Sequence, residues 1–347
     1  MRITIFILLL LITGQSSAQI RLNDNVILSG FGTASAAISD SSVKAYNYRN
    51  IDNHLCLDCD STLGLQLDWL INKDFRSSVQ VVKRPQDTFS DPELEWAYLA
   101  YTQQNSTLKL GRQRLPLFIM SEYYYVSAAY PWSRPPQDVY DNIMGITHYD
   151  GISYEWTTLT SSESQLRIAP FVAIPQTSDY NGYGIDFSLD FKTTLGITID
   201  YTYQDSVFHL GYINTSATRY NDVGLPKTHY SLDMITAGFN IVDGNITYTA
   251  EALLDQNLYA TWYSGISYQY QNIQPYLQYG QRRRMFSDNS IIGGIKTSIT
   301  PSLFINLEWA YVTGPDSYQS GHLNEMQLTG DRETNANIYT LSVSFLF

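Results

Sequence analysis

Two cysteines near the N-terminal end of the chain have the most distinctive chemistry in the sequence. Cys56 and Cys59 are separated by Leu57 and Asp58, and the chain holds no other cysteine. In an oxidising compartment this spacing most simply closes a small disulfide loop. A metal site would need more ligands than the nearby His54 and Asp58, and thioredoxin-type redox catalysis needs a strand followed by a helix N-terminus. We therefore expect a disulfide and no metal.

The histidines do not favour catalysis. Hydrolysis by a side-chain nucleophile or by an activated water needs a Ser–His or Asp–His arrangement. No nucleophile motif accompanies the five histidines, which are His54, His148, His209, His229 and His322. We interpret His148 and His209 as structural. The prediction is that the chain is not an enzyme, has no catalytic residue and binds no cofactor.

Further candidates are charged residues at alternate positions within otherwise apolar stretches. Alternate side chains of a strand share one face, so these charges would line one face while apolar side chains cover the other. The acids are Asp68, Glu93, Glu95, Glu155, Asp200, Glu251 and Glu308, and the bases are Arg76, Arg84, Lys109, Arg167, Arg282 and Lys296. If that face encloses water, the charges orient a passing solute through their field. For each of these residues, the alternative is a solvated wall side chain with no functional role.

A long segment without alternation, residues 113–147, carries a second set of candidates. Its charged residues are Glu122, Arg114, Arg134, Asp138 and Asp141, and Arg112 stands just before it. Its aromatic and proline-rich stretches predict a stiff segment. The aromatic residues Tyr123, Tyr124, Tyr125, Tyr130 and Trp132 either stack on the ring of a sugar-like solute or pack the segment against its surroundings.

The elements that must position these residues are strands, because period-two alternation dominates the sequence. Its clearest example is the end of the chain, where Tyr339, Leu341, Val343, Phe345 and Phe347 alternate with small polar residues. Residues 63–69, 195–203, 246–252 and 303–311 repeat the pattern. A tilted strand of about 9–11 residues crosses the apolar layer of a bilayer. A soluble β-sandwich would also alternate, but it would not place Trp and Tyr at the rims of so many strands.

The connections predict the number of strands. Short turns stand at residues 72–74, 104–106, 161–163, 204–206, 243–245, 271–272 and 300–302. Longer loops alternate with them at residues 39–60, 85–92, 113–147, 174–193, 218–230, 255–258, 283–290 and 313–335. Eight loops and seven turns join sixteen antiparallel strands, the first beginning by about Val26. Residues 184–191 alternate as well; we assign them to the fourth loop, and 18 strands remain the alternative.

The first residues predict export. Arg2 precedes an apolar run at residues 3–12, and small residues at 16–18 suit a signal peptidase. We expect a signal peptide over residues 1–18 and a mature domain over residues 19–347, beginning near Gln19. No later apolar run approaches the ~18 residues of a membrane-spanning helix.

The composition suits a strand protein of this kind. Losing Arg2 with the signal peptide changes the formal net charge from −12 to −13, which excludes a nucleic-acid binder with a basic surface. The chain has 28 Tyr but only 21 Lys plus Arg, and its mean hydropathy is −0.20. This composition is unusual for a cytosolic enzyme, and it fits a barrel with one face towards lipid and one towards water.

Several motifs resemble outer-membrane proteins of Gram-negative bacteria. The terminal Phe347 on an alternating strand resembles the C-terminal signal that the barrel-assembly machinery recognises. Residues 108–113 and 150–154 look like the porin strands on either side of the third loop, although this chain lacks the Pro-Glu-Phe-Gly-Gly tip of enterobacterial general porins. The chain resembles the porin superfamily, in a general-porin-like and uncharacterised branch. The resemblance implies an all-β transmembrane antiparallel barrel whose third loop folds inward and constricts it.

The resemblance also implies a function and partners. We expect an outer-membrane channel for passive diffusion of ions and small hydrophilic solutes, with a weak preference for cations. The alternatives are a porin specific for saccharides or other substrates, using Tyr123, Tyr125, Tyr130 and Trp132, and a barrel receptor or adhesin. Expected partners are outer-membrane lipid and lipopolysaccharide. The run Arg282–Arg284 at the end of a strand would clamp lipopolysaccharide phosphates, line an outer vestibule or form a solvated rim. A homotrimer would pack through the small residues Gly30, Gly32, Ala34, Ala36 and Ala37.

Overall fold

The computed structural model describes residues 19–46, 48–85, 91–141, 146–182, 185–221, 223–224, 226–256, 258–284, 287–314, 322–323 and 333–347. The predicted signal peptide, residues 1–18, lies outside these ranges and stays a prediction. Among the described residues, no helix is long and apolar enough to cross a bilayer.

Sixteen antiparallel strands form a closed barrel. In chain order they are β2 (Val26–Ser39), β3 (Thr62–Leu70), β4 (Phe75–Lys83), β5 (Glu93–Gln103), β6 (Ser106–Arg114), β7 (His148–Leu159), β8 (Ser164–Ala173), β11 (Thr194–Tyr203), β12 (Ser206–Asn221), β13 (Thr228–Asp243), β14 (Ile246–Asp255), β15 (Tyr259–Tyr268), β16 (Ile273–Arg284), β17 (Asp288–Thr300), β18 (Leu303–Thr313) and β19 (Asn335–Leu346). The last strand closes the ring on the first, from the pair Ile338↔Ser39 to the pair Leu346↔Phe31. The prediction of sixteen strands is confirmed, and the 18-strand alternative is wrong.

Three shorter strands pair outside the ring. β1 (Ile20–Asn23) forms a hairpin with β2, and β9 (Gln176–Gly182) forms one with β10 (Ile185–Phe191). β8 pairs directly with β11, so the β9–β10 hairpin is an insertion between two barrel strands. Residues 185–191 are therefore a strand, as the alternation suggests, yet they belong to the fourth loop, as assigned; Gly184 lies outside the described residues.

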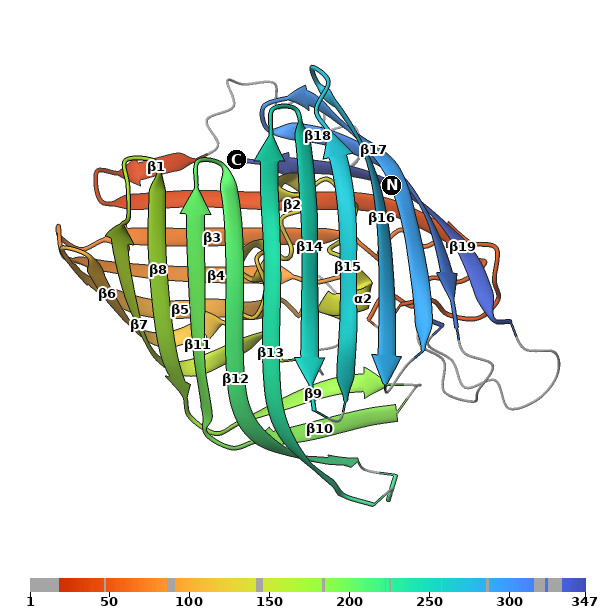
Figure 1. The fold of residues 1–347 in the computed structure, drawn as a ribbon, viewed down its shortest axis with the longest axis horizontal. Helices are drawn as coiled ribbons and strands as arrows, with labels where there is room; N and C mark the ends of the chain where they lie inside the picture. The colour runs from red at the N-terminus through yellow and green to blue at the C-terminus, as the bar shows by residue number, and fades with distance from the viewer. Residues whose placement is uncertain are drawn as a thin grey trace.

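The connections divide the barrel into two ends (Figure 1). All seven predicted short turns join consecutive strands at one end, where Phe347 also lies; we call it the turn end. The eight longer connections lie at the other end, the loop end. Of these, residues 115–147, between β6 and β7, carry the only helical turns among the described residues: η2 (Ser121–Tyr123), η3 (Ser127–Ala129) and α2 (Gln137–Tyr140).

The alternation of side chains follows the barrel wall. On β18, Ile305, Leu307 and Trp309 are exposed on the outer face, whereas Asn306 and Glu308 are buried on the inner face. The same pattern repeats around the ring, so apolar side chains cover the outside. A charge on that face would cost about 2–4 kcal/mol near the middle of a bilayer, which explains why most charges point inward.

The small residues expected at a trimer contact do not all share one face. Ala37 is buried inside the barrel, where it pairs with Cys56 of the first loop. Gly30 and Gly32 lie under the rings of Phe347 and Phe345, which stack on each other with centroids 6.3 Å apart. The outer surface over these glycines is therefore made of the chain's own terminal aromatic rings rather than of bare backbone.

Two paired glycines allow close strand contacts where the 115–147 segment leaves and rejoins the wall. Gly111 of β6 faces Gly151 of β7 in the register. Gly111 has φ +128°, and a Cβ there would lie 2.3 Å from the Ala97 carbonyl oxygen. A Cβ on Gly151 would lie 2.0 Å from the Val172 carbonyl oxygen. Both obstacles are backbone atoms, which cannot rotate away.

We predict that Gly111→Ala and Gly151→Ala each lower the free energy of unfolding by about 1–3 kcal/mol, because the added methyl group forces strained backbone. Gly293→Ala is the matched control, since its Cβ would meet nothing closer than 3.7 Å. Urea unfolding in detergent micelles, followed by circular dichroism, measures the difference. Equal midpoints for the three variants would contradict the prediction.

Candidate functional site

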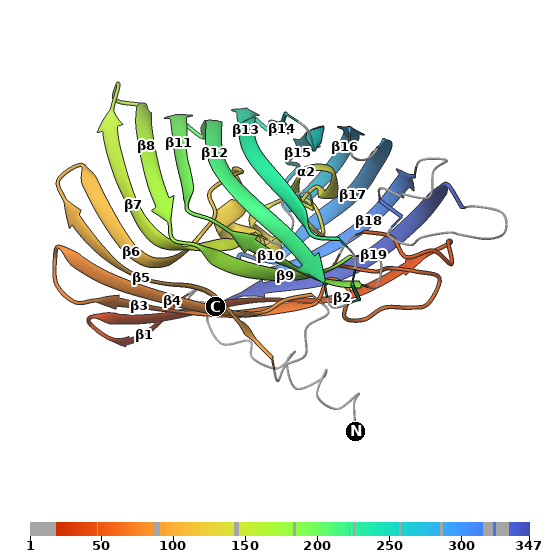
Figure 2. The same ribbon diagram turned by 90° about the horizontal axis from the view of Figure 1, so that it is seen from below.

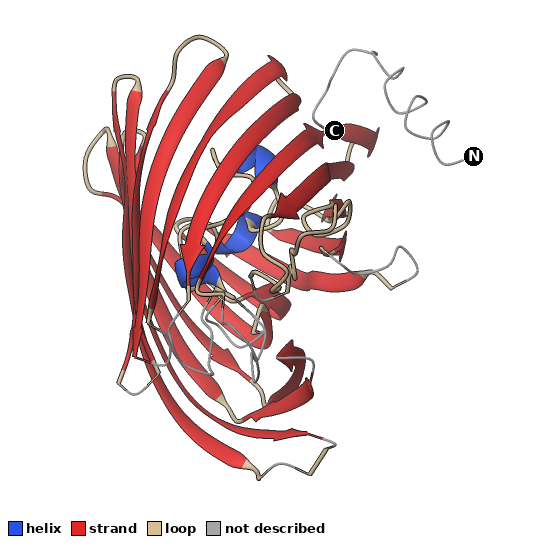
Figure 3. Ribbon diagram, turned by 90° about the vertical axis from the view of Figure 1, so that its right-hand side faces the viewer, coloured by secondary structure: helices blue, strands red, loops and turns tan. Residues whose placement is uncertain are grey.

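The 115–147 segment makes many of its hydrogen bonds to inward-facing side chains of the barrel wall. Figure 3 shows its helices, in blue, lying between the strands. These contacts separate the predicted charges into those that hold the segment and those that face open space.

Arg134 joins this segment to the first loop and to two strands. Its guanidinium donates to both carboxylate oxygens of Asp60 at 2.7–3.1 Å, to Glu308 of β18 at 3.1 Å and to the Thr340 hydroxyl of β19. The ring of Tyr46 covers the guanidinium, 5.2 Å from its carbon. The side chains of Arg134 and Glu308 are each 1% exposed. Arg134 is therefore a buried structural cation.

Asp138, on α2, ties the segment to β17 and to the eighth loop. Its carboxylate accepts from the Ser290 hydroxyl at 2.7 Å and lies 2.9 Å from the Nε2 atom of His322. The backbone N–H of His322 donates to Asp288, whose carboxylate also binds Arg282 of β16. Arg282, predicted as a lumen-wall charge, is therefore fully engaged in a buried pair.

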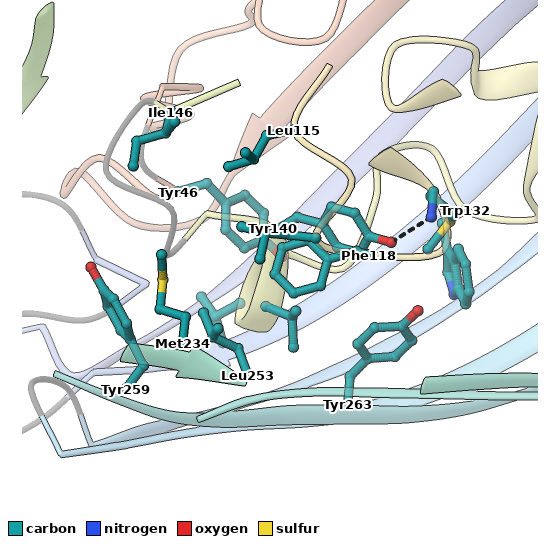
Figure 4. Packing of buried hydrophobic residues seen from close by; sticks show 14 of the residues in the cluster. Tyr46, Leu115, Phe118, Trp132, Tyr140, Ile146, Met234, Leu253, Tyr259 and Tyr263 are labelled. Carbon is teal, nitrogen blue, oxygen red and sulfur yellow. Dashed lines mark hydrogen bonds between the residues drawn. The ribbon is translucent and has the colours of Figure 1, made fainter. Parts of the chain in front are cut away.

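Glu251 of β14 receives three hydrogen bonds at the centre of the segment. The backbone N–H of Ile119 donates to one oxygen at 2.7 Å, and the hydroxyls of Tyr140 and Tyr263 donate to the other at 2.7 and 2.6 Å. Figure 4 shows Tyr140, Tyr263 and Phe118 within the apolar cluster around this point. The acid thus fixes the segment by satisfying groups that burial has removed from water.

Lys296 of β17 fixes the next turn. Its ammonium donates to the carbonyl oxygens of Ser127, Ala128 and Tyr130 at 3.1, 2.7 and 2.6 Å. These three acceptors use every N–H of the ammonium group. Lys296 therefore cannot also serve as a free charge towards a solute.

Two contacts hold the start of the segment to the opposite wall. Arg84 and Arg114 both bind Glu95 of β5, and Arg114 also donates to the Ser121 carbonyl at 3.1 Å. His209 of β12 lies between the Leu117 carbonyl oxygen, 3.0 Å from Nε2, and Asp200, 2.7 Å from Nδ1. A histidine interpreted as structural thus has a defined structural contact.

The remaining inward charges face open space between the segment and the wall of β6, β7, β8 and β11. Lys109 pairs with Glu155 at 2.5 Å, and Arg167 pairs with Asp200 at 3.3 Å. These four side chains are 17, 18, 30 and 20% exposed, respectively. Glu122 of η2 is exposed and lines, with Pro116 and Arg167, two adjoining hollows. Lys109 and Glu155 also line the first hollow, and Asp200 and His209 also line the second.

Four predicted residues lie elsewhere. Arg112 binds Asp150 through two hydrogen bonds of 2.9 Å, at positions that share the outer face with Ile152, so it does not join the charges around the 115–147 segment. Arg76 pairs with Asp68 at 3.0 Å on β4 and β3 and is 46% exposed. Glu93 is exposed at the loop end of β5.

The predicted aromatic residues are mainly packing groups in this structure. Tyr125, Tyr130 and Trp132 are buried, and Trp132 meets Tyr263 edge to face with centroids 5.8 Å apart. Tyr125 lies under the guanidinium of Arg114, at 5.1 Å. Tyr123 keeps partial exposure and lines the hollow around Glu122. Tyr123, Tyr130 and Trp132 also border a third hollow, with Asn240 and Gln274.

The sequence did not point to several residues that hold the segment. Asp60 follows Cys59, which is joined to Cys56 by a disulfide with Cα atoms 5.7 Å apart, and Arg49 binds the same carboxylate at 2.9 Å. Asp288 begins β17, and His322 lies in the eighth loop. Only the position of Asp60 directly after a cysteine could have signalled that it is fixed in space.

Burial and neighbouring cations shift the pKa values of two loop carboxyl groups, those of Asp60 and Asp141. Burial alone would raise the pKa of Asp60, but the guanidiniums of Arg134 and Arg49 hold it below its usual range. Burial raises the pKa of Asp141 to about 7, although Arg49, Arg282 and His322 lie near enough to lower it. Asp60 is therefore ionised, whereas Asp141 changes its charge near neutral pH.

We predict that Arg134→Gln lowers the free energy of unfolding by about 3–5 kcal/mol, because it leaves Glu308 buried without its cation and leaves Asp60 with Arg49 alone. Arg76→Gln removes the same charge from an exposed pair and should change stability by at most about 1 kcal/mol. Urea unfolding in micelles compares the two variants. A similar small loss for both would show that the Arg134 contacts do not hold the loops.

The stability of the fold should depend on Asp141. Its carboxyl pKa rises from the ordinary 3.8 to about 7 on folding. Between these values the folded protein keeps a proton that the unfolded chain has lost, so stability falls as the pH rises towards 7 and stays lower above it. Asp141→Asn should reduce the loss of thermal stability between about pH 5 and about pH 8. An unchanged loss in the variant would refute this assignment.

Among the comparisons with known proteins, the one with solved structures identifies the fold. No family model and no curated protein matches the chain. Among solved structures, the anion-selective porin from Comamonas acidovorans aligns with a TM-score of 0.63 at 12% identity, covering 93% of this chain and 99% of that one. OmpF of Salmonella typhi, in complex with daunomycin, gives 0.63 at 11%, covering 95% and 100%.

A third structure supports the same conclusion. The outer membrane channel DcaP of Acinetobacter baumannii gives a TM-score of 0.62 at 12% identity, covering 93% of this chain and 97% of that one. Identities this low establish the fold alone. The chain therefore has the sixteen-stranded barrel fold of outer-membrane porins.

Proposed function

We propose that the protein is a porin of the Gram-negative outer membrane, which lets ions and small hydrophilic solutes diffuse passively through its barrel. A closed barrel of sixteen strands is too wide for wall side chains alone to fill. The 115–147 segment would fold inward as a constriction loop, consistent with its many hydrogen bonds to inward-facing wall residues. The solute would pass between the segment and the wall of β6, β7, β8 and β11, where Glu122 and Arg167 line two hollows.

The observation that carries this proposal is the uneven exposure of the inward charges. Arg134, Glu308 and Asp138 are buried and bonded to the segment, so they act as anchors. Glu122 and Arg167, in contrast, border the same two hollows from opposite sides. An acid on the loop facing a base on the wall creates a transverse field that orients a permeating solute.

The proposal includes a weak preference for cations, which the partly exposed charges around these hollows support. The partly exposed acids are Glu122, Glu155 and Asp200, and the partly exposed bases are Lys109 and Arg167. Three acids against two bases leave one net negative charge beside the path. The overall charge of −12 has the same sign, but distant charges are screened within about 10 Å at 0.1 M salt.

The proposal includes the expected processing and partners. Residues 1–18 would direct export, and the barrel-assembly machinery would insert residues 19–347 into a layer containing lipopolysaccharide. Arg283 is exposed at the loop end of β16, which suits contact with lipopolysaccharide phosphates. A homotrimer would pack through the outer face of β2, where Ala34 and Ala36 alternate with buried residues.

A saccharide-specific porin is the second candidate, and it has weaker support. The burial of Tyr125, Tyr130 and Trp132 leaves little ring surface for a sugar to stack on. In its favour, Tyr123 shares a hollow with the side-chain amides of Asn240 and Gln274. A receptor or adhesin role has no particular feature in its favour, and the absence of enzymatic activity remains a prediction.

We predict that Glu122→Gln reduces cation preference. The reversal potential of purified protein in a planar bilayer, under a KCl gradient, should move towards the anion side, because the variant removes the acid opposite Arg167. Glu163→Gln removes the same charge from a turn, where Glu163 binds Gln204, and serves as the control. Equal reversal potentials for both variants would contradict the proposed path.

A further inference from the structure

The hairpin β9–β10 has an apolar face that the channel proposal does not explain. On β10, Phe187, Leu189 and Phe191 are buried, whereas Asp186, just before them, and Asp190 are exposed. This is the alternating stretch that the sequence shows within the fourth loop. A surface loop without a role would not need three large apolar side chains on one face.

The hairpin lies across the loop end of the barrel. Figures 1 and 2 show β9 and β10 running transverse to the barrel strands there. β10 pairs with the outer end of β12 over five positions, from Phe187↔Asn221 to Phe191↔Ala217. The Lys192 N–H donates to the Ser216 carbonyl at 2.9 Å beside this ladder. The buried face of β10 is therefore turned towards the interior of the barrel.

Below the hairpin, several strands of the inner wall carry apolar residues towards the loop end. On β8, Arg167 is followed by Phe171 and Ala173, and on β12 His209 is followed by Ile213 and Ala217. The buried apolar residues of other strands at this end are Leu232 and Met234 of β13, Leu253 of β14, Ile292 of β17, Ala310 and Val312 of β18, and Ala336 and Ile338 of β19. Arg282 of β16 and Asp288 of β17, which are charged and lie at the same end, are buried and paired with each other.

These residues form one apolar layer with the loops. They belong to a single buried cluster that also contains Leu189 and Phe191 of the hairpin and Leu117 and Phe118 of the 115–147 segment. The hollow around Glu122 reaches up to Tyr149 and Phe171, which are members of this cluster. The polar space thus ends where the apolar layer begins.

An apolar constriction stops ions by excluding water, since an ion that enters it must lose its hydration. We propose that the β9–β10 hairpin is a lid that completes an apolar seal at the loop end of the barrel. This inference rests on the proposed channel function. In the sealed state, β10 is paired with β12; opening separates these two strands and withdraws Phe187, Leu189 and Phe191 from the layer.

Hydrogen bonds within the hairpin allow it to move as one unit. β9 and β10 pair over seven positions, and the Ser188 hydroxyl donates to Asp179 across them at 2.6 Å. The pairing of β10 with β12, which seats the hairpin on the barrel, is shorter and covers five positions. Chain segments of two residues, Ile174–Pro175 and Lys192–Thr193, connect the hairpin to β8 and β11 and would serve as hinges.

A reversible crosslink tests the lid. Asp190 and Thr218 are register partners between β10 and β12, so Asp190→Cys with Thr218→Cys would lock the hairpin on its seat. Opposed residues in an antiparallel ladder have Cα atoms about 4.5–5.5 Å apart, which a disulfide can span. Asp179→Cys with Ser188→Cys crosslinks β9 to β10 only and is the matched control. Peptide mapping verifies each bond beside the native Cys56–Cys59 pair.

The readout is the open fraction of single channels in planar bilayers, before and after reduction. The β10–β12 crosslink should lower it at least about tenfold, with recovery on reduction, because only the sealed state remains populated. The β9–β10 crosslink should leave it unchanged. A variant with residues 176–191 replaced by a short Gly-Ser linker should stay open.

Two other outcomes would overturn different claims. Equal open fractions for the oxidised and reduced β10–β12 crosslink would refute the lid while leaving the channel intact. No conductance from the parent and from the hairpin-replacement variant, both folded by circular dichroism, would refute the proposed channel function itself.

Discussion

Closure of the barrel by pairing β19 with β2 is the constraint on which the rest of this structure depends. A bilayer offers no water to an unpaired strand edge, so a spanning sheet must satisfy every backbone group within itself. Sixteen strands achieve this here, and the terminal residue takes part: Phe347 and Gly30 exchange two backbone hydrogen bonds of 2.8 and 2.9 Å. The same closure creates an interior that wall side chains cannot fill.

The contacts between the 115–147 segment and the barrel wall are asymmetric. Contacts to β14, β17, β18 and β19 fix the 115–147 segment through buried ion pairs and hydrogen bonds, which Arg134, Asp138, Glu251 and Lys296 provide. Removing charges from water is costly unless each finds a partner, so these contacts also select one arrangement of the loops. On the other side, Lys109, Glu155, Arg167 and Asp200 keep partial contact with open space. One wall therefore holds the segment, and the other borders the path that we propose.

The strands and turns could be predicted from the sequence because their causes are local. Alternation shows which face of a strand is apolar, and short polar turns recur at regular intervals, so the sixteen strands follow from the sequence. The assignment of 184–191 needed the rule that an even number closes the ring. Its pairing with β12 was not predictable, since that contact joins residues about 30 positions apart.

The roles of the charged residues were less predictable because they depend on contacts distant in sequence. Alternation places Glu251, Lys296 and Glu308 on the inner face, but it does not show that loop residues bury them. Arg134 is an anchor only because Asp60, 74 positions away, lies beside it. Arg112 and Arg114 are two positions apart on β6, so strict alternation would put both side chains on one face. Arg112 instead binds Asp150 at the outer face, and Arg114 binds Glu95 inside. The irregular backbone at Gly111, with φ +128°, precedes this change of face.

The central claim is that this closed barrel contains a water-filled path. Single-channel recording of the purified, refolded protein in a planar bilayer tests it most directly. The account predicts discrete current steps that rise linearly with voltage and with KCl concentration. A protein that is folded and inserted, as shown by its circular dichroism and protease resistance, but carries no such current under any condition would contradict it.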